Sequence, residues 1–257
     1  MEVITSYCTN VGNVKQVNQD SLAVKVVNSP DGKIVFAIIC DGMGGLEQGE
    51  LASKEVVMAF HKWFMKEFAV MVERQTFSKE ALYHQWQCVI EQLNEDLGKY
   101  AEQQGIMMGT TLSVLLIYQK QYYICHVGDS RIYKIEDALQ QITKDHTLVA
   151  QEVELGLITK EQALNDMRRS ILLQCIGASK IVEPQYETGE IHQDVTFLLT
   201  SDGFVHYISD EELFHHFKSD RIREKEQVTK TCEELTSVAM QRGERDNITV
   251  ISITLKM

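Results

Sequence analysis

Five aspartates of this chain share one local design, because each lies where an apolar run meets a turn. They are Asp20, Asp41, Asp129, Asp202 and Asp246. One aspartate at a turn is ordinary, since its short side chain can hydrogen bond to the local backbone. Five that adjoin apolar runs are harder to explain in this way, because neighbouring strand ends would bring them to a common edge. Clustered carboxylates repel one another unless cations neutralise them, so the pattern predicts a metal site.

The ligands of this predicted site are oxygens, which favours hard ions, Mg²⁺ or Mn²⁺, over zinc. The sequence contains neither an HExxH motif nor a Cys/His cluster that would compete with this interpretation. Two ions that share a carboxylate would hold a hydroxide and neutralise phosphoryl oxygens. Such a pair suits the hydrolysis of phosphate esters.

The most distinctive stretch is the apolar run of residues 34–40, which ends in Asp41 and the glycines Gly42, Gly44 and Gly45. The run is too short to cross a bilayer and rich in β-branched residues, so it predicts a buried strand. Glycine leaves the backbone bare, so a metal ion, water or phosphate could approach the main chain. Taken alone, a strand followed by a tight turn explains the stretch equally well.

Further strands are expected at residues 3–9, 21–27, 111–118, 122–127, 131–135, 185–190, 195–200 and 248–255. Amphipathic helices are expected around residues 56–64, 82–97 and 228–239, where apolar residues recur every three or four positions. The connections among residues 111–135 are too short for helical crossovers, so these neighbouring strands are expected to pair antiparallel. This argues against a doubly wound parallel sheet and favours a layered α+β fold.

The totals describe one acidic domain of 257 residues with a formal charge of −12 and only two prolines. The charge argues against a nucleic-acid-binding surface, because a phosphate backbone is held by clustered Lys and Arg. Six cysteines without a CxxC pair are expected to be reduced thiols in the cytoplasm. Neither a secretion signal nor a membrane span is expected.

The sequence resembles the metal-dependent protein serine/threonine phosphatases of type 2C, in their compact bacterial form. Five ordered motifs carry this resemblance over nearly the whole chain: Val17-Asn18-Gln19-Asp20; Asp41 to Gly45; Gly109-Thr110-Thr111; Gly128 to Arg131; and the pair Ser201-Asp202-Gly203 and Arg245-Asp246-Asn247. The resemblance implies a four-layer αββα sandwich, in which two central antiparallel β-sheets are flanked by antiparallel helices. The metals would lie at one end of the sheets.

The resemblance also implies the roles of individual residues. The implied ligands of two core ions and a looser third ion are Asp20, Asp41, Gly42, Asp129, Asp202 and Asp246. Asp41 would bridge the core ions, Gly42 would offer its carbonyl oxygen, and Asp20 would act mainly through bound water. Asp202 and Asp246 would complete the coordination of the first core ion. Asp129 would help Asp202 to bind the third ion.

The implied reaction is the hydrolysis of phosphoserine and phosphothreonine in proteins, by direct attack of a metal-bridging hydroxide without a phosphoenzyme. The implied partners are phosphorylated proteins that are the targets of a serine/threonine kinase, and a monomer is the default expectation.

Three positions depart from the family pattern. Lys15 stands where the family usually has an arginine that grips the substrate phosphate, so we expect weaker phosphate binding rather than inactivity. Gln19 stands where many relatives have glutamate, and its amide can still accept a hydrogen bond. Met43 replaces a histidine that some relatives offer as a general acid, so metal-bound water is the simplest proton source.

Other residues near the motifs receive supporting roles. Gly109-Thr110-Thr111 is expected to pack beside the site, and Arg131 to tether the metal-site loop by pairing with a carboxylate. His126, His146 and His206 are interpreted as structural. The segment of about residues 145–177 resembles a family flap, where Arg168 and Arg169 either attract a phosphorylated peptide or belong to a solvated helix face.

Two alternatives remain open from the sequence. The chain could be a catalytically weak or inactive sensor with a phosphatase fold, for which Lys15 is the best support. It could also keep the chemistry but act on a small phosphorylated metabolite or an anti-sigma-factor antagonist.

Overall fold

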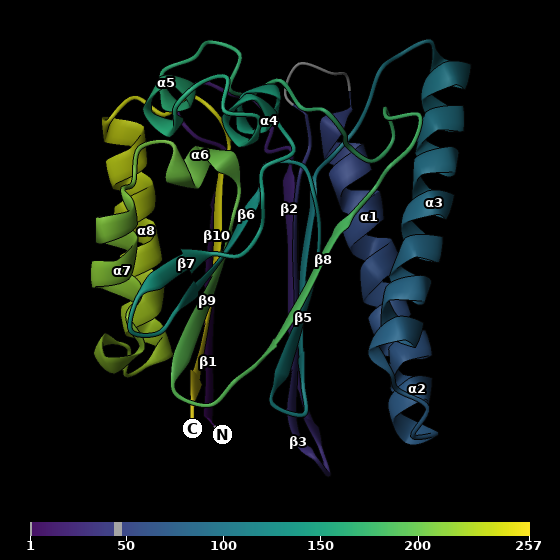
Figure 1. The fold of residues 1–257 in the computed structure, drawn as a ribbon, viewed down its shortest axis with the longest axis vertical. Coiled ribbons are helices and arrows are strands. Elements are labelled where there is room, and N and C mark those ends of the chain that lie inside the picture. Colours follow the sequence, from purple (N-terminus) through teal and green to yellow (C-terminus); the bar gives the residue numbers. More distant parts are fainter. Residues whose placement is uncertain (1, 44–47) are drawn as a thin grey trace.

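A computed structural model describes residues 2–43 and 48–257. Two five-stranded antiparallel sheets pack face to face, and helices cover the outer face of each (Figure 1). The predicted four-layer αββα sandwich is confirmed. Gly44 and Gly45, the last two glycines of the predicted turn after Asp41, lie outside the described residues.

Each sheet combines strands from distant parts of the chain. The first sheet has the order β1 (Glu2–Asn10), β10 (Ile248–Lys256), β9 (Val195–Thr200), β6 (Arg131–Ile135) and β7 (Leu139–Gln141). The second has the order β2 (Asp20–Ser29), β3 (Gly32–Asp41), β4 (Leu112–Tyr118), β5 (Gln121–Val127) and β8 (Gln185–Glu190). All pairings of named strands are antiparallel, as expected, and only the short strand β7 was not anticipated.

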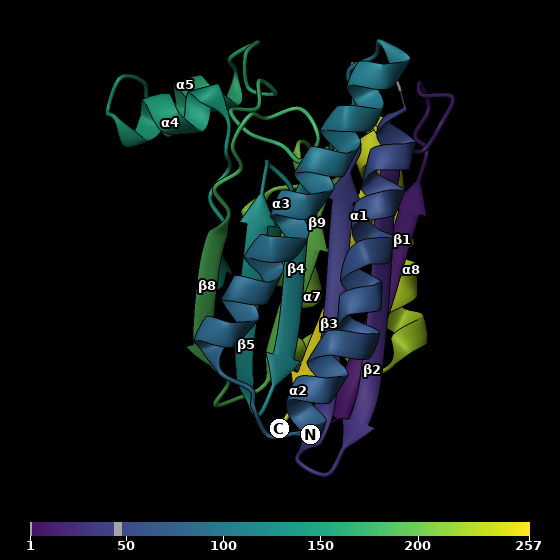
Figure 2. The ribbon, with the colours of Figure 1, turned by 90° about the vertical axis from the view of Figure 1, so that its right-hand side faces the viewer.

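The helices form two outer layers. The second sheet is covered by α1 (Gly49–Trp63), the π-helical segment η1 (Phe64–Phe68), α2 (Ala69–Glu73) and α3 (Lys79–Gln104) (Figure 2). The first sheet is covered by α6 (Asp202–Val205), α7 (Asp210–Phe217), the 3₁₀ segment η2 (Ser219–Arg221) and α8 (Lys225–Gln241). The short helices α4 (Leu148–Glu154) and α5 (Lys160–Leu164) project from one end of the sandwich (Figure 2).

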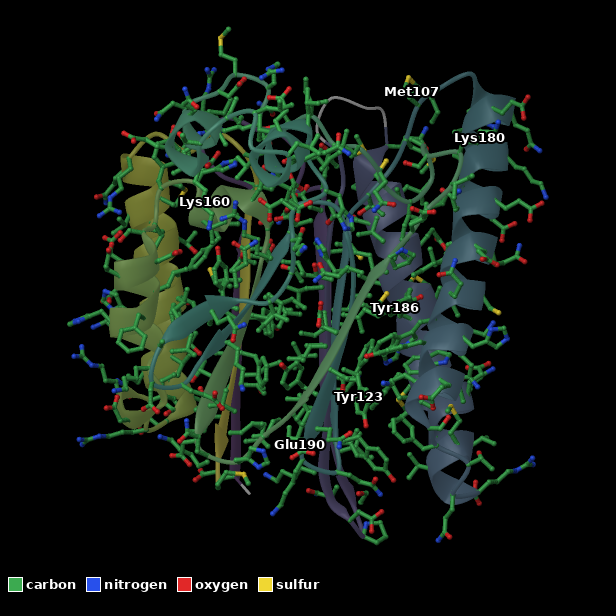
Figure 3. All side chains as sticks on the ribbon, in the orientation of Figure 1. Met107, Tyr123, Lys160, Lys180, Tyr186 and Glu190 are labelled. Carbon is green, nitrogen blue, oxygen red and sulfur yellow. The ribbon has the colours of Figure 1, made fainter. Side chains whose placement is uncertain are left out.

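Strand β3 shows why its sequence is almost continuously apolar. Phe36 and Ile38 point into the core beneath α1 and α3, whereas Ala37 and Ile39 point into the core between the two sheets. Because successive side chains of a strand face opposite sides, a strand with a core on each side must be apolar at both sets of positions. Tyr123 and Tyr186 lie on neighbouring strands of the same sheet, where side chains fill the space toward α3 (Figure 3).

One expectation about pairing was wrong. Residues 122–127 and 131–135 were expected to pair with each other, but β5 and β6 belong to different sheets. The short connection crosses between the sheets at Gly128, whose φ of +106° is readily adopted only by glycine. A short loop excludes a helical crossover, but it does not require the two strands to pair. The crossing places Asp129 between the sheets' ends.

Two further expectations concern the whole chain. All six cysteines are free in the structure. In the described residues, no helix combines the length and the apolar character that a membrane span requires.

Candidate active site

The five aspartates gather at one end of the sandwich because of where their strands begin and end. Asp20 begins β2 and Asp41 ends β3, and the sheet register pairs these two residues directly. Asp202 follows β9 and Asp246 precedes β10, its antiparallel neighbour. Asp129 lies in the crossing loop after β5. Each sheet thus contributes two carboxylates, and the loop that joins the sheets contributes the fifth.

Electrostatics show that these carboxylates lie close to one another. Burial raises the pKa of Asp41 well above its usual range, and the charges of Asp20, Asp202, Asp129 and Asp246 raise it further. Burial raises the pKa of Asp20 to about 7, although a hydrogen bond from Thr249 acts in the opposite direction. The pKa values of Asp129 and Asp202 are raised as well, first by burial. A cation among these groups would relieve the repulsion.

Asp20 and Asp202 each have one carboxylate oxygen in contact with a protein group and one left for such a cation. Thr249 Oγ1 donates to Asp20 Oδ2 at 2.6 Å, and His206 Nε2 lies 3.4 Å from Asp202 Oδ2. In the described part of the chain, Asp20 Oδ1 and Asp202 Oδ1 are buried without a hydrogen-bond partner. A buried charged oxygen is costly unless it is paired. The all-oxygen donor set and these orphaned atoms fit Mg²⁺ or Mn²⁺.

The fit is incomplete at Asp246. Lys15 Nζ lies 3.0 Å from Asp246 Oδ1, so lysine is paired with a predicted ligand rather than standing free for a phosphate. Within residues 2–43 and 48–257, no three His, Cys, Asp or Glu side chains form a ready ligand group for one ion. Ions bound here would therefore need water or backbone oxygens as additional ligands.

The backbone of Asp41 is held by the predicted threonine motif. Thr111 Oγ1 accepts a hydrogen bond from Asp41 N at 2.9 Å, and Thr110 Oγ1 donates to Asp41 O at 2.9 Å. The side chain of Thr111 also contacts Ser130 Oγ at 2.7 Å. This motif packs beside the site as expected, and it fixes the end of β3.

Gly42 is glycine because the backbone around it is crowded. Its N–H donates to the carbonyl oxygen of Gln19 at 3.0 Å. A Cβ at this position would lie 2.3 Å from the carbonyl oxygen of Gly49 and 2.7 Å from that of Gln19. The close approach ties the loop before β2 to the end of β3 and the start of α1.

Asn247 joins the same loop to the first sheet. Its Oδ1 accepts a hydrogen bond from Gln19 N at 2.8 Å, and its Nδ2 donates to the carbonyl oxygens of Val11 and Val17 at 3.0 and 3.1 Å. The loop that carries Lys15 is therefore fixed at both ends by one amide side chain. Asn247 adjoins Asp246, so the two predicted motifs support each other.

Two of the three histidines have a structural environment. His126 is buried, with Nδ1 2.9 Å from Ser113 Oγ and Nε2 3.0 Å from the carbonyl oxygen of Gly128. Burial and the neighbouring His146 lower the pKa of His126 to about 3, so its ring is neutral. His146 Nδ1 accepts a hydrogen bond from Gly128 N at 3.1 Å. Both rings thus brace the crossing loop next to Asp129.

Arg131 makes the predicted carboxylate pair. Its Nη2 lies 2.7 Å from Asp145 Oδ2 and its Nε 3.0 Å from Asp145 Oδ1, a two-point contact of fixed geometry. The pair joins the start of β6 to the segment that leads into α4.

His206 and Glu244 were not identified as a pair from the sequence. His206 Nδ1 lies 3.0 Å from Glu244 Oε2, while His206 Nε2 faces Asp202. Burial alone would lower the pKa of His206, but Glu244 and Asp202 raise it overall. The available signals were the spacing of four residues between Asp202 and His206 and the position of Glu244 two residues before Asp246.

The two arginines of the flap, Arg168 and Arg169, have different surroundings in the structure. Arg168 is paired with Glu152 and Asp166, each 2.8 Å from its Nη2, so its charge is already neutralised on an exposed surface. This supports the solvated-face interpretation for Arg168. Arg169 is close enough to His206 to influence its pKa, and it also lines a small polar hollow on the flap.

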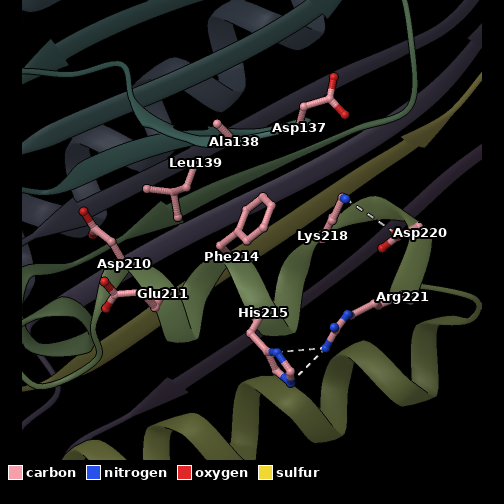
Figure 4. Close-up of a pocket in the computed structure, with 10 residues that line it drawn as sticks. All are labelled: Asp137, Ala138, Leu139, Asp210, Glu211, Phe214, His215, Lys218, Asp220 and Arg221. Atoms are coloured by element: carbon pink, nitrogen blue, oxygen red, sulfur yellow. Dashed lines mark hydrogen bonds and ion pairs between the residues drawn. The ribbon is translucent and has the colours of Figure 1, made fainter.

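A separate pocket lies between α7 and the turn from β6 to β7 (Figure 4). Carboxylates and cations of α7 and η2 surround the ring of Phe214, and some of them pair, as Lys218 does with Asp220 at 3.7 Å. None of the five aspartates lines it. It is therefore distinct from the candidate active site.

Comparison with known proteins identifies the class. The family model for Protein phosphatase 2C matches residues 12–245, so the chain belongs to this family of hydrolases. Serine/threonine phosphatase stp of Listeria innocua is 31% identical over 248 residues, which cover 95% of this chain and 93% of the relative. The crystal structure of serine/threonine phosphatase Stp1 from Staphylococcus aureus has a TM-score of 0.83 at 27% identity, covering 100% of this chain and 96% of that chain.

A further structural relative carries metal. The catalytic domain of the serine threonine protein phosphatase PstP, in complex with two manganese ions, has a TM-score of 0.78 at 26% identity, and both chains are fully covered. The predicted membership of the type 2C family and the predicted phosphatase class are confirmed.

Proposed function

We propose that this phosphatase hydrolyses phosphoserine and phosphothreonine in proteins with the help of Mn²⁺ or Mg²⁺. The ions would be held by Asp20, Asp41, Gly42, Asp129, Asp202 and Asp246. Bound divalent ions would activate a water molecule for direct attack on phosphorus and neutralise charge on the phosphoryl oxygens. The observation that carries the proposal is the convergence of five aspartates with two buried, unpartnered oxygens.

The chain's own residues would do the remaining work. Asp41 is positioned by the hydroxyls of Thr110 and Thr111, so its carboxylate is held at the end of a rigid strand. Lys15 would turn from Asp246 toward the substrate phosphate once cations neutralise the carboxylates. A lysine supplies charge there without the two-point grip of an arginine. The manganese complex of PstP supports the choice of ion.

We also propose the domain organisation, the cellular location and the partners of this protein. Residues 1–257 would act as a single catalytic domain with a flap at about residues 145–177. The protein would work in the cytoplasm as a monomer and oppose a serine/threonine kinase. The relatives, which are named serine/threonine phosphatases, support phosphorylated proteins as substrates.

The proposal is tested by removing one ligand at a time. Asp41→Asn and Asp202→Asn should each lower Mn²⁺-dependent hydrolysis of p-nitrophenyl phosphate and of a phosphothreonine peptide by more than about a hundredfold. Loss of a residue that only supports a metal ligand usually costs about 10- to 100-fold. Asp137→Asn, in an exposed turn, is the matched control and should retain full activity. Full activity of either site variant, or of the wild-type protein in a chelator, would contradict the proposal.

A further inference from the structure

His206 and Glu244 link the two aspartates that the first sheet contributes, through one ion pair and a set of hydrogen bonds. His206 lies at the end of α6, one helical turn after Asp202, and its Nε2 faces Asp202 Oδ2 at 3.4 Å. Its Nδ1 faces Glu244 Oε2 at 3.0 Å. The line Asp202–His206–Glu244 thus spans from α6 to the loop before β10.

The same glutamate also fixes the loop that carries Asp246. Glu244 Oε1 accepts hydrogen bonds from the backbone N–H groups of Arg245 at 2.7 Å and of Asp246 at 2.8 Å. The Glu244 side chain is only 5% exposed, so these contacts are made away from bulk water, where they are stronger than at the surface. Removing the carboxylate would release both backbone groups and His206 together.

The geometry leaves one carboxylate oxygen of Asp202 free. His206 engages Oδ2 of Asp202, which leaves Oδ1 buried and without a partner in the described part of the chain. Residues that hold the far side of a ligand fix its orientation and tune its affinity for metal. The pair also links α6 to the loop before β10, in addition to the close packing of Gly203 against Asn247.

We propose that His206 and Glu244 are positioning residues that hold Asp202 and Asp246 as a pair in the geometry that binds a divalent cation. The inference rests on the proposed function, since it assumes that these aspartates bind metal. It assigns the pair a role in metal affinity rather than in the binding of the phosphorylated substrate, because the two side chains contact Asp202, each other and the backbone at Asp246.

The test is a Mn²⁺ titration of metal-free protein by calorimetry. His206→Ala and Glu244→Ala should each raise the Mn²⁺ dissociation constant about 10- to 100-fold, the usual effect of losing a residue that supports a ligand. The double variant should be little weaker than Glu244→Ala alone, because the loss of Glu244 already releases His206 and the loop backbone. At saturating Mn²⁺, the KM for a phosphothreonine peptide should be unchanged.

A matched control comes from an exposed pair of the same residue types. His192 Nε2 lies 3.1 Å from Glu190 Oε2, with the two side chains 77% and 61% exposed, and Glu190 lies toward the opposite end of the sheets (Figure 3). His192→Ala should bind Mn²⁺ as the wild-type protein does. Glu244→Gln keeps an acceptor oxygen for the loop but presents an amide to His206, so its affinity should fall between those of the wild-type protein and Glu244→Ala.

Melting of the metal-free variants in a chelator separates positioning from stability. A purely structural role would lower the melting temperature but leave the Mn²⁺ affinity of the folded protein unchanged, and that result would overturn the inference. If the alanine variants fail to fold, Glu244→Gln and His206→Gln decide by the same affinity criterion. If the wild-type protein itself binds no Mn²⁺, both this inference and the proposed function fail, whereas unchanged variants of a metal-dependent enzyme contradict the inference alone.

Discussion

The two halves of the carboxylate site are held in different ways. Asp20 and Asp41 occupy paired positions of β2 and β3, where backbone contacts and threonine hydroxyls hold them. Asp202 and Asp246 lie outside the strands, where charged side chains contact them. The half on β2 and β3 is therefore fixed by the sheet itself. The half around α6 depends on side chains that can be replaced without rebuilding the backbone.

The largest effect should follow from crowding the backbone of the sheet half. In Gly42→Ala the new methyl group would meet two backbone carbonyl oxygens, at 2.3 and 2.7 Å, so the end of β3 must shift. Overpacking of this kind costs about 1–3 kcal/mol of stability. A displacement of about 1 Å at a catalytic group can lower activity about a hundredfold. Thermal melting and p-nitrophenyl phosphate hydrolysis measure the two effects.

Two other glycines sharpen this result. Gly203→Ala would place its Cβ 2.2 Å from the carbonyl oxygen of Asn247, so it strains the half around α6 in the same way but against one carbonyl only. We expect a smaller loss of activity than in Gly42→Ala. Gly98→Ala on α3 meets no atom closer than 3.6 Å and should stabilise the helix by about 0.5–1 kcal/mol. Wild-type activity of Gly42→Ala would show that backbone packing does not position Asp41.

A smaller effect is expected from the hydroxyl that holds Asp41. Thr111→Val removes the acceptor of Asp41 N and should cost about 1–3 kcal/mol, the usual penalty for an unpaired buried group. Activity should fall about tenfold and the Mn²⁺ dissociation constant should rise by a similar factor, because a group that positions a ligand is lost. Thr111→Ser should restore both stability and activity.

A threonine pair elsewhere provides the control for this substitution. Thr196 Oγ1 lies 2.9 Å from Thr254 Oγ1 in the first sheet, and both side chains are buried. Thr196→Val should lower stability to a similar degree without a change in kcat. An equal loss of activity in both variants would mean that Thr111 acts only through general stability.

The pH dependence of stability tests whether the clustered aspartates of the site have raised pKa values. Burial raises the pKa of Asp20 to about 7 and raises those of Asp41, Asp129 and Asp202 above their ordinary range. The folded protein therefore binds more protons than the unfolded chain between about pH 4 and pH 7, where unfolded aspartate is already ionised. Stability contributed by these groups is present at low pH and is lost as the pH rises through this window.

Thermal melting in a chelator measures this slope. The melting temperature should be lower at about pH 8 than at about pH 5, and each kcal/mol lost corresponds to about 2–4 °C for a chain of this size. Saturating Mn²⁺ should remove most of the slope, since it neutralises the carboxylates. Asp41→Asn should flatten the slope and Asp137→Asn should not. A metal-free protein whose stability rises over this range would contradict the raised pKa values.

The same contrast explains how much could be predicted from the sequence. An apolar run that ends in aspartate and glycine marks a strand end, so Asp41 and the convergence of its neighbours followed from local patterns. The change of sheet at Gly128 did not, because loop length alone does not tell which partner a strand chooses. The pairing of His206 with Glu244 was missed, since contacts between side chains far apart in sequence leave no periodic signal. Lys15 was noticed as a departure, but its contact with Asp246 was not anticipated.

The smallest expected effect concerns Lys15, which belongs to the half around α6. Lys15→Arg should lower the KM for a phosphothreonine peptide by no more than about fivefold with little change in kcat, because partly exposed ion pairs are worth up to about 1 kcal/mol. The planar guanidinium can grip a phosphate at two points, which an ammonium cannot. Lys25→Arg, exposed on β2, is the control for a general effect of arginine. An unchanged KM would show that Lys15 serves Asp246 alone, and the grip on the phosphate would then have to come from another residue.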